Sequence, residues 1–409
     1  MASNSKAKIT RRGFAEAGAK AMTLGTTAFS APLILAAQSS NASNQATAVD
    51  QNPIRRRGVG FRTLHAAKAS PGLTLFAHGA GIVYLIDLYG KVVHTWTFPH
   101  PIHYAYLTEK GTLFCNGKIP NDTLLGKVPS HCGVVLEADW NGKVLWEVRH
   151  PDHHNDGRLL PNGNVLLVCA TALPDDVAQK VQGGRREPGE NRKMGGDYLV
   201  EMSRDGRSIW QWNSWEHLDP ALDVITAVQD DRAEWTHANG IHELPDDHVL
   251  VSFRNTSTVI NVDRKSGKIV WRMGAPPLAG QHAPTPLANG NILIFDNGPH
   301  RLDESLNFSR VIEIQPATKK IVWKYQEPVV TGFFSPRISN AQRLPNGNTL
   351  INEGVFGRFF EVTTEGEVVW EYVNPHFGPP DAPAARQQNS TFRAYRYTEE
   401  QIKRARSAS

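Results

Sequence analysis

One short motif recurs six times along the chain and constrains the fold more than any other feature. Each copy is a turn followed by aliphatic or β-branched residues and a tryptophan. The six tryptophans are Trp96, Trp146, Trp210, Trp271, Trp323 and Trp370, so successive copies lie 47 to 64 residues apart. A period of this size is typical of repeat architectures such as propellers. We expect each tryptophan to pack between neighbouring units rather than to take part in chemistry.

A second marker is a Leu-Pro-Asn-Gly turn followed by a strand, at residues 160–163 and 344–347, with variants in the other units. Asn and Gly accept the positive φ of tight hairpin turns. Each unit therefore predicts four short strands, for example 284–287, 292–295, 311–314 and 321–325. Six such units predict an all-β fold, a six-bladed β-propeller of four-stranded antiparallel blades. A β-sandwich would not explain six equivalent tryptophans. The sequence leaves open which strand closes the ring.

The N-terminal residues have the features of an export signal. Positive residues at 6, 8, 11 and 12 precede a weakly apolar run over 21–37, and residues 10–14 (Thr-Arg-Arg-Gly-Phe) resemble a twin-arginine signal. The run is short and polar for a membrane span, which needs ~20 strongly apolar residues; an uncleaved signal anchor is the alternative. We expect a signal and linker over 1–48, the propeller over 58–374 and a C-terminal extension over 375–409, with a last helix capped by Thr398.

Composition excludes some classes of protein. The net charge is +4 and basic residues are interleaved with acidic ones, so no nucleic-acid partner is indicated. We expect a periplasmic or secreted protein with small-molecule partners and no stable membrane association after signal cleavage.

The three cysteines form no C-x-x-C pattern. Either one disulfide joins Cys115 and Cys132, or all three are buried free thiols, which is the favoured interpretation. The oligomeric state is not indicated.

Polar residues recur at fixed offsets from the turn glycine or its equivalent. His103, Asn155, Asn239 and His282 stand eight residues before it, and His153, His237 and Arg337 stand ten before it. Because these offsets differ by two, both fall on one face of an extended strand. Seven residues after the turn come Lys118, Arg254 and Asn297. First strands line the channel of a propeller, so we expect a ring at one mouth made of His103, His153 with its neighbour His154, His237, Asn239 and His282, surrounded by Arg254, Asn297 and Arg337.

This residue set indicates an anion site. Arginine offers a planar charged fork to an oxyanion, and neutral histidine can attack or take a proton near pH 7. Acidic residues look sparse at this level, which argues against a hard-cation site. A histidine-only zinc or copper site stays open. The alternatives are therefore a metal-dependent lyase or hydrolase and a non-catalytic ligand-binding propeller. No cofactor is expected. Two units carry long insertions, at 172–196 and 212–234. Long insertions in repeats tend to cluster on the binding face, but a solvated loop is the default expectation for the first.

Four motifs carry a family resemblance: His153-His154 before Leu-Leu-Pro-Asn-Gly, residues 235–239 (Trp-Thr-His-Ala-Asn), residues 252–254 (Ser-Phe-Arg) and Gln281-His282. They resemble those of bacterial arylsulfotransferases that do not use the nucleotide sulfate donor, a six-bladed propeller family. The resemblance implies ping-pong transfer of a sulfuryl group from a phenolic ester to another phenol through a sulfurylated histidine.

Matched motif to motif, His282 stands where that family has its acceptor histidine. His237 and Asn239 match a His-x-Asn pair, and Arg254 matches the sulfate-binding arginine. His153 or His154 matches the remaining histidine; spacing favours the first and the family's register the second. His237 or the doubled histidine is expected as general acid and base, and His103, Asn297 and Arg337 as substrate-binding residues. The family's cysteine pair near the active site is absent, and the insertion at 172–196 differs in kind.

Overall fold

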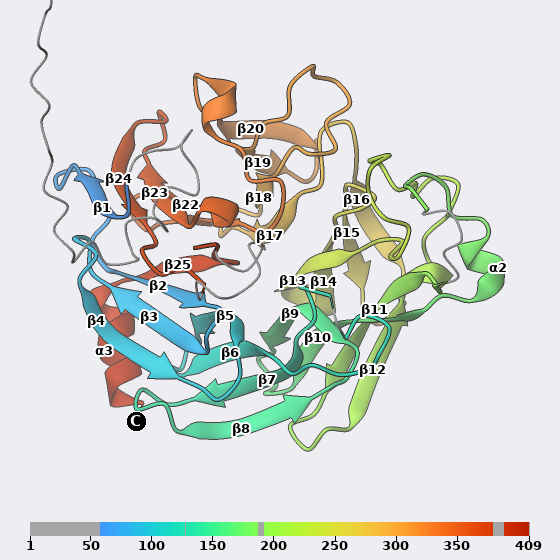
Figure 1. Cartoon of the computed structure of the whole chain (residues 1–409), viewed down its shortest axis with the longest axis horizontal. Helices are drawn as coiled ribbons and strands as arrows, with labels where there is room; N and C mark the ends of the chain where they lie inside the picture. The colour runs from blue at the N-terminus through green and yellow to red at the C-terminus, as the bar shows by residue number, and fades with distance from the viewer. Residues whose placement is uncertain (1–57, 127, 187–191, 379–387, 409) are drawn as a thin grey trace, which may run out of the picture. The chain divides into compact units, whose positions relative to one another are not determined.

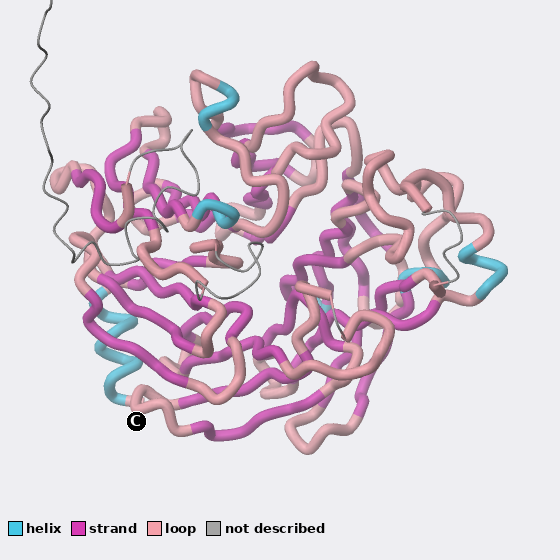
Figure 2. Tube along the Cα trace, in the orientation of Figure 1, coloured by secondary structure: helices cyan, strands magenta, loops and turns pink. Residues whose placement is uncertain are grey.

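The computed structural model describes residues 58–126, 128–186, 192–378 and 388–408, all within the compact unit Asn44–Ser409. The expected export signal lies outside the described residues. Six antiparallel sheets form a ring, which confirms the six-bladed β-propeller (Figure 1). Strands and loops make up most of this part of the chain (Figure 2). None of its helices is long and apolar enough to cross a membrane.

Each sheet has a first strand that contacts first strands of neighbouring sheets and lies nearest the centre. In ring order these are β25 (Ala394–Tyr397), β5 (Ile102–Leu107), β9 (His153–Leu159), β13 (Ala238–Leu244), β17 (His282–Pro286) and β21 (Asn340–Arg343). The second strands are β2 (Leu73–His78), β6 (Leu113–Lys118), β10 (Val165–Ala172), β14 (His248–Phe253), β18 (Ile292–Asp296) and β22 (Thr349–Glu353). The strands expected at 284–287 and 292–295 therefore correspond to β17 and β18.

The outer half of each sheet carries the repeated tryptophans. The third strands are β3 (Ile82–Ile86), β7 (Gly133–Ala138), β11 (Gly195–Met202), β15 (Thr258–Asp263), β19 (Arg310–Gln315) and β23 (Arg358–Val362). The fourth strands are β4 (Val92–Thr97), β8 (Val144–Arg149), β12 (Ser208–Asn213), β16 (Ile269–Met273), β20 (Lys320–Tyr325) and β24 (Val368–Val373). The helices are short: α2 (Asp175–Ala178), α3 (Glu399–Ser407) and the 3-10 turns η2 (Ser214–Glu216), η3 (Pro245–Asp247), η4 (Val330–Gly332) and η5 (Gly354–Phe356).

The repeated tryptophans join neighbouring blades, as expected. The indole nitrogens of five of them donate to backbone oxygens of the next blade: Trp96 to Asp139 (3.2 Å), Trp210 to Arg264 (3.1 Å), Trp271 to Pro316 (2.9 Å), Trp323 to Thr364 (2.8 Å) and Trp370 to Leu88 (2.6 Å). The sixth, Trp146, donates instead to Glu137 of its own blade. The repeat thus encodes the spacing between blades as well as the blades themselves.

The ring closes through the C-terminal segment. β25 pairs antiparallel with β2, with Leu73 opposite Tyr397, and so becomes the first strand of the first blade. β1 (Gly60–Leu64) adds a fifth strand outside β24. Residues 394–397, expected within an extension beyond the propeller, are therefore part of it, because strand pairing and not the repeat marker recruits them. Thr398 caps α3 through a capping box with Gln401, as expected.

A buried ion pair holds this closing strand to the opposite side of the ring. Both nitrogens of the Arg393 fork donate to Asp156 of β9, at 3.0 and 2.7 Å, and one of them also donates to the backbone oxygen of Asn239 at 3.2 Å. The hydroxyl of Tyr104 donates to the same carboxylate. Both charged side chains are buried. These contacts join four blades, those of β25, β5, β9 and β13.

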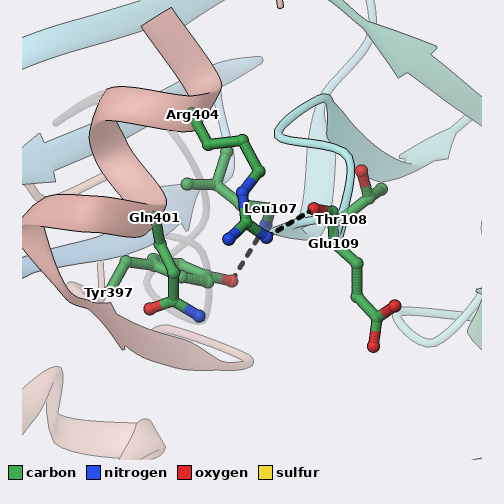
Figure 3. Close-up of a pocket in the computed structure, with 6 residues that line it drawn as sticks. All are labelled: Leu107, Thr108, Glu109, Tyr397, Gln401 and Arg404. Atoms are coloured by element: carbon green, nitrogen blue, oxygen red, sulfur yellow. Dashed lines mark hydrogen bonds between the residues drawn. The ribbon is translucent and has the colours of Figure 1, made fainter.

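At the far end of the first strands, α3 covers the turn that follows β5. A pocket of about 300 Å³ lies there, lined by Leu107, Thr108, Glu109, Tyr397, Gln401 and Arg404 (Figure 3). Its walls are joined to each other: the backbone N–H of Leu107 donates to the Tyr397 hydroxyl, and Arg404 donates to the backbone oxygen of Glu109, each at 2.9 Å. We interpret this pocket as part of the ring closure.

The three cysteines are buried and free, which was the favoured interpretation of the sequence.

Candidate active site

His154, His237, Asn239 and His282 lie at or next to the start of first strands, and the backbone there is irregular. Pairing of β13 and β17 with the second strands shifts register near Asn239 and after His282. Asn155, His237, Ala283 and Ile338 have left-handed φ values of 54°, 51°, 48° and 53°. Such values are uncommon outside glycine. The simple two-residue alternation assumed from the spacing therefore does not hold at this level, and adjacent side chains can both turn towards the site.

His282 is buried and both its ring nitrogens are occupied. Nδ1 lies 2.8 Å from Oδ1 of Asn297, and Nε2 accepts a hydrogen bond of 3.1 Å from the backbone N–H of Ile338. The Asn297 amide nitrogen donates to the backbone oxygens of Ser335 (2.7 Å) and Ile338 (2.8 Å). This fixes Oδ1 as the group facing His282, so Nδ1 carries the proton and Nε2 the lone pair. Burial, and then the charge of Arg254, hold the pKa of His282 well below its usual value.

His237 has the opposite electrostatic environment. Its Nδ1 lies 2.9 Å from a carboxylate oxygen of Glu234. Burial alone would lower the pKa of His237, but the charge and hydrogen bond of Glu234 raise it above its usual value. Burial would likewise raise the pKa of Glu234, yet His237 brings it down to about 2. The pair is therefore an ionised carboxylate that favours a protonated imidazole, with Nε2 of His237 turned towards Asn155, 3.5 Å away.

The two adjacent histidines of β9 differ in their contacts. The ring of His154 lies 6.3 Å from that of His237, its Nε2 donates to Asp197 at 2.9 Å, and its Nδ1 accepts from the side chain of Asn155 at 3.1 Å. Neither ring nitrogen of His153 has a hydrogen-bond partner among the described residues. Burial, and then the charge of His154, lower the pKa of His153 to about 3. The structure thus brings His154 to the side of His237.

Arg254 is partly buried and leaves part of its fork open. Its Nη1 donates to Asp230 at 3.1 Å and to the side chain of Asn255 at 3.0 Å. Its other guanidinium nitrogens have no partner within the described segments. Asp230 also lies 2.7 Å from Nε2 of His300. Burial would raise the pKa of Asp230, but His300 and Arg254 hold it below its usual value. The charge of Arg254 acts against protonation of both His282 and His237.

The remaining expected residues divide into two groups. The Asn239 side chain donates to the backbone oxygen of Gln281 at 2.7 Å, beside His282, and its own oxygen has no partner in the described part of the chain. His103 instead contacts Phe392, with 3.8 Å between ring centres and the rings tilted by 38°, and burial lowers its pKa well below the usual value. Arg337 contacts Gln388 at 3.4 Å, in an exposed setting. The structure gives His103 and Arg337 no contact with His282 or His237.

Comparison with known proteins decides the family. The model of the family described as arylsulfotransferase (ASST) matches residues 27–279 and 277–396. The chain belongs to the arylsulfotransferase family. It is 21% identical over 369 residues to arylsulfate sulfotransferase AssT of Escherichia coli O6:H1, an alignment that covers 69% of this chain and 59% of that protein. The chain therefore spans less than two thirds of that relative's length.

A likeness among solved structures concerns the fold alone. A Bacteroides caccae protein of unknown function is 14% identical, with a TM-score of 0.50 over 81% of this chain and all of that one.

Three carboxylates in the site were missed by sequence reasoning. Asp197, Asp230 and Glu234 surround the histidines of this arylsulfotransferase-family chain, so the expectation of sparse acidic residues was wrong. Counting from the turn glycine covered only the first two strands of each unit. Asp197 lies on a third strand, and the other two lie in the insertion at 212–234, so none of them was found. The two insertions do meet, through bridges that pair Gly183 with Ile225 and Gly195 with Glu234. The position of Glu234 three residues before His237 was the signal available in the sequence.

His154 and two of these carboxylates also form a group that could hold a metal ion. One ligand atom each from His154, Asp197 and Glu234 lies within 4.8 Å of the others. The donors are already engaged, however. His154 donates to Asp197, and the other oxygen of Asp197 accepts from the Thr236 hydroxyl and from the backbone N–H of Ala238 at 2.7 Å. The group therefore acts as a hydrogen-bond network that orients the histidines.

Proposed function

We propose that the chain transfers a sulfuryl group from a phenolic sulfate ester to an acceptor phenol through a sulfurylated His282. Family membership supports the reaction class. The single observation that carries the assignment of His282 is the 2.8 Å contact of its Nδ1 with Oδ1 of Asn297. Its depressed pKa and its contact with the fixed amide of Asn297 leave a neutral ring with the lone pair on Nε2, the form that can attack sulfur at neutral pH.

The proposed acid is His237. Its raised pKa and its contact with Glu234 favour the imidazolium form, and Nε2 is free of a strong partner. His154 is less suited, because both its ring nitrogens already have partners. Two neighbouring histidines whose pKa values are shifted in opposite directions suit a base-like nucleophile and an acid.

Arg254 and Asn239 are the proposed anion donors. The open nitrogens of Arg254, whose charge acts on His282, and the second N–H of the Asn239 amide, which donates to Gln281 next to His282, can offer hydrogen bonds to sulfuryl oxygens. Charge on these oxygens grows in the transition state, so donors held in place stabilise it more than the free ester.

The first half-reaction balances on these residues. The Nε2 lone pair of His282 forms the N–S bond while the S–O bond of the ester breaks, with its electron pair on the phenolic oxygen. His237 gives its proton to that oxygen, and phenol leaves. Asn297 cannot take a proton, so Nδ1 stays protonated and the sulfurylated ring is a good leaving group. In the second half-reaction, neutral His237 takes the proton of the acceptor phenol, whose oxygen attacks sulfur and frees His282.

Mass spectrometry tests the proposal. Mixing the protein with an aryl sulfate and no acceptor should add ~80 Da, the sulfuryl mass, to the peptide containing His282, and added phenol should remove it, as covalent catalysis requires. His282→Ala should give neither adduct nor transfer. His248→Ala is the matched control, because His248 begins β14, at the end of that strand away from Arg254, and contacts Asn261 at 3.2 Å. An adduct on another residue would reassign the nucleophile.

A metal-dependent hydrolase is the second candidate function, favoured by the group of His154, Asp197 and Glu234. It predicts stoichiometric zinc or copper in protein purified without chelator, and ester hydrolysis that needs no acceptor and stops when the metal is removed. Sulfuryl transfer predicts phenol-dependent turnover that survives chelation. The two readouts together separate the candidates.

A further inference from the structure

The backbone of Ile338 is held against His282 at both of its polar atoms. Its N–H donates to Nε2 of His282 at 3.1 Å, and its carbonyl oxygen accepts from the Asn297 amide at 2.8 Å. Asn297 in turn contacts Nδ1 of His282 at 2.8 Å. The imidazole, the amide and one peptide residue therefore form a closed cycle of hydrogen bonds, which fixes the Ile338 N–H beside the lone pair.

This peptide segment is held in an unfavourable conformation. Ile338 and Ser339 have φ values of 53° and 89°, and the first is a β-branched residue for which a left-handed backbone is a genuine outlier. The surrounding contacts impose it: the backbone N–H of Ser339 donates to the oxygen of Phe392 at 3.2 Å, and its hydroxyl lies 3.0 Å from that of Ser335. Strained backbone that its surroundings maintain tends to occur where a backbone group has a function.

The chemistry of His282 requires the Ile338 N–H to change partner. The lone pair that accepts this N–H is the one that would form the bond to sulfur, so the hydrogen bond cannot persist through attack. Asn297 keeps hold of the carbonyl oxygen of the same residue, so the N–H stays close to Nε2. A buried N–H that loses its acceptor is costly. The groups that arrive at Nε2 are the sulfuryl oxygens, which accept hydrogen bonds and carry growing negative charge.

We propose that the backbone N–H of Ile338 is a further donor to the sulfuryl group in the reaction at His282. This N–H donates to Nε2 of His282 in the free site and donates to a sulfuryl oxygen once the N–S bond forms. This inference rests on the proposed sulfuryl transfer. Ile338 itself makes and breaks no covalent bond; it supplies a preorganised donor of the oxyanion-hole kind, on the opposite side of the nucleophile from its partner Asn297.

Replacing one backbone amide by an ester tests the role directly. The α-hydroxy counterpart of isoleucine at position 338 keeps the side chain and carbonyl but removes the N–H. We expect the burst of phenol from an aryl sulfate to slow ~10²–10³-fold, as for loss of one oxyanion donor, with the adduct still on His282. The matched control is the same replacement at Val355, whose N–H donates to the Ser335 hydroxyl at 3.1 Å; it should slow the burst by less than about tenfold, the effect of one ordinary hydrogen bond.

A side-chain variant guards against a purely structural explanation. Ile338→Gly retains the N–H and readily adopts positive φ, so it should keep the burst rate within about tenfold of wild type, an effect comparable to that of one hydrogen bond. An ester at 338 that reacts at the wild-type rate or faster, an equal loss in the Val355 control, or an equal loss in Ile338→Gly would each overturn the inference. Absence of any adduct on wild-type His282 would instead overturn the proposed function.

Discussion

Oδ1 of Asn297 lies 2.8 Å from Nδ1 of His282, and the amide nitrogen of Asn297 is committed to two backbone oxygens. The backbone thus fixes the orientation of the Asn297 amide, and the Asn297 amide in turn fixes the tautomer of His282. Asn297, expected from its offset to bind substrate, contacts His282 in this structure and presents the lone pair at Nε2. The predictions below follow from this and related contacts.

Asn297→Ala should slow the sulfurylation step, because His282 would then populate both tautomers and lose its fixed orientation. We expect a loss of up to about 10⁴-fold, the loss associated with a wrong tautomer in a catalytic histidine. Burst kinetics measure the rate, and ¹⁵N NMR of the imidazole reports the tautomer. Asn261→Ala, which removes the contact with His248 at 3.2 Å, is the control. An unchanged burst with an unchanged tautomer would contradict the prediction.

Glu234→Gln should move the alkaline limb of the first half-reaction to lower pH. The Glu234 carboxylate raises the pKa of His237, and the protonated form is the proposed acid, so the rate falls as pH rises through that pKa. Removing the negative charge lowers the pKa of His237, so the alkaline limb moves to lower pH. Esters of weakly acidic phenols should lose most, since their leaving oxygen needs the proton. Asp247→Asn, at an exposed carboxylate paired with Arg264, should leave the profile in place.

Arg393→Met should destabilise the propeller strongly, because it leaves the buried Asp156 carboxylate without its two-pronged partner and with Arg158, 3.5 Å away, as its remaining cation. Breaking a buried pair costs about 3–5 kcal/mol, which thermal unfolding can measure. Asp156→Asn in the same chain should restore part of the loss. Arg404→Ala removes only a half-exposed contact with Glu109 and should cost less than about 1.5 kcal/mol, the net contribution of one hydrogen bond. A single Arg393→Met variant as stable as wild type would show that β25 closes the ring without this pair.

The same pair gives the sign of a pH effect. Burial alone would raise the pKa of Asp156, but Arg393 and Arg158 hold it below its usual value. Its contribution to stability is therefore present above the unfolded pKa of ~3.9 and is lost as pH falls through the lower folded value. In Arg393→Met this acid-sensitive component should shrink.

Changing Arg11 and Arg12 together to Lys should keep the precursor inside the cell, because the pair is the part of residues 10–14 that resembles a twin-arginine signal. Cell fractionation measures it. Lys6→Arg with Lys8→Arg keeps the charge of the same region outside the pair and should leave export intact. Unchanged secretion of the Arg11 and Arg12 variant would reject the export proposal.

The sequence by itself determined the blades and much of the histidine site. Turn chemistry and a tryptophan repeat are local signals, and each recurs at the same place in its unit. Equivalent positions in a closed repeat meet at one level of the ring, so offsets from the turn led to His237, Asn239 and His282. Arg254 followed from the same offsets, and the motif resemblance gave the family. Such inferences need no knowledge of which distant segments touch.

Only the tertiary structure decided the rest. Closure by β25, the contact of Asp197 with His154, and the hydrogen bond from Asn297 to Ile338 all join segments with no fixed offset between them. Left-handed residues at the first-strand ends also broke the alternation on which the choice between His153 and His154 depended. The physical reason is that a repeat specifies equivalent positions, whereas insertions, chain ends and strained turns acquire partners through packing.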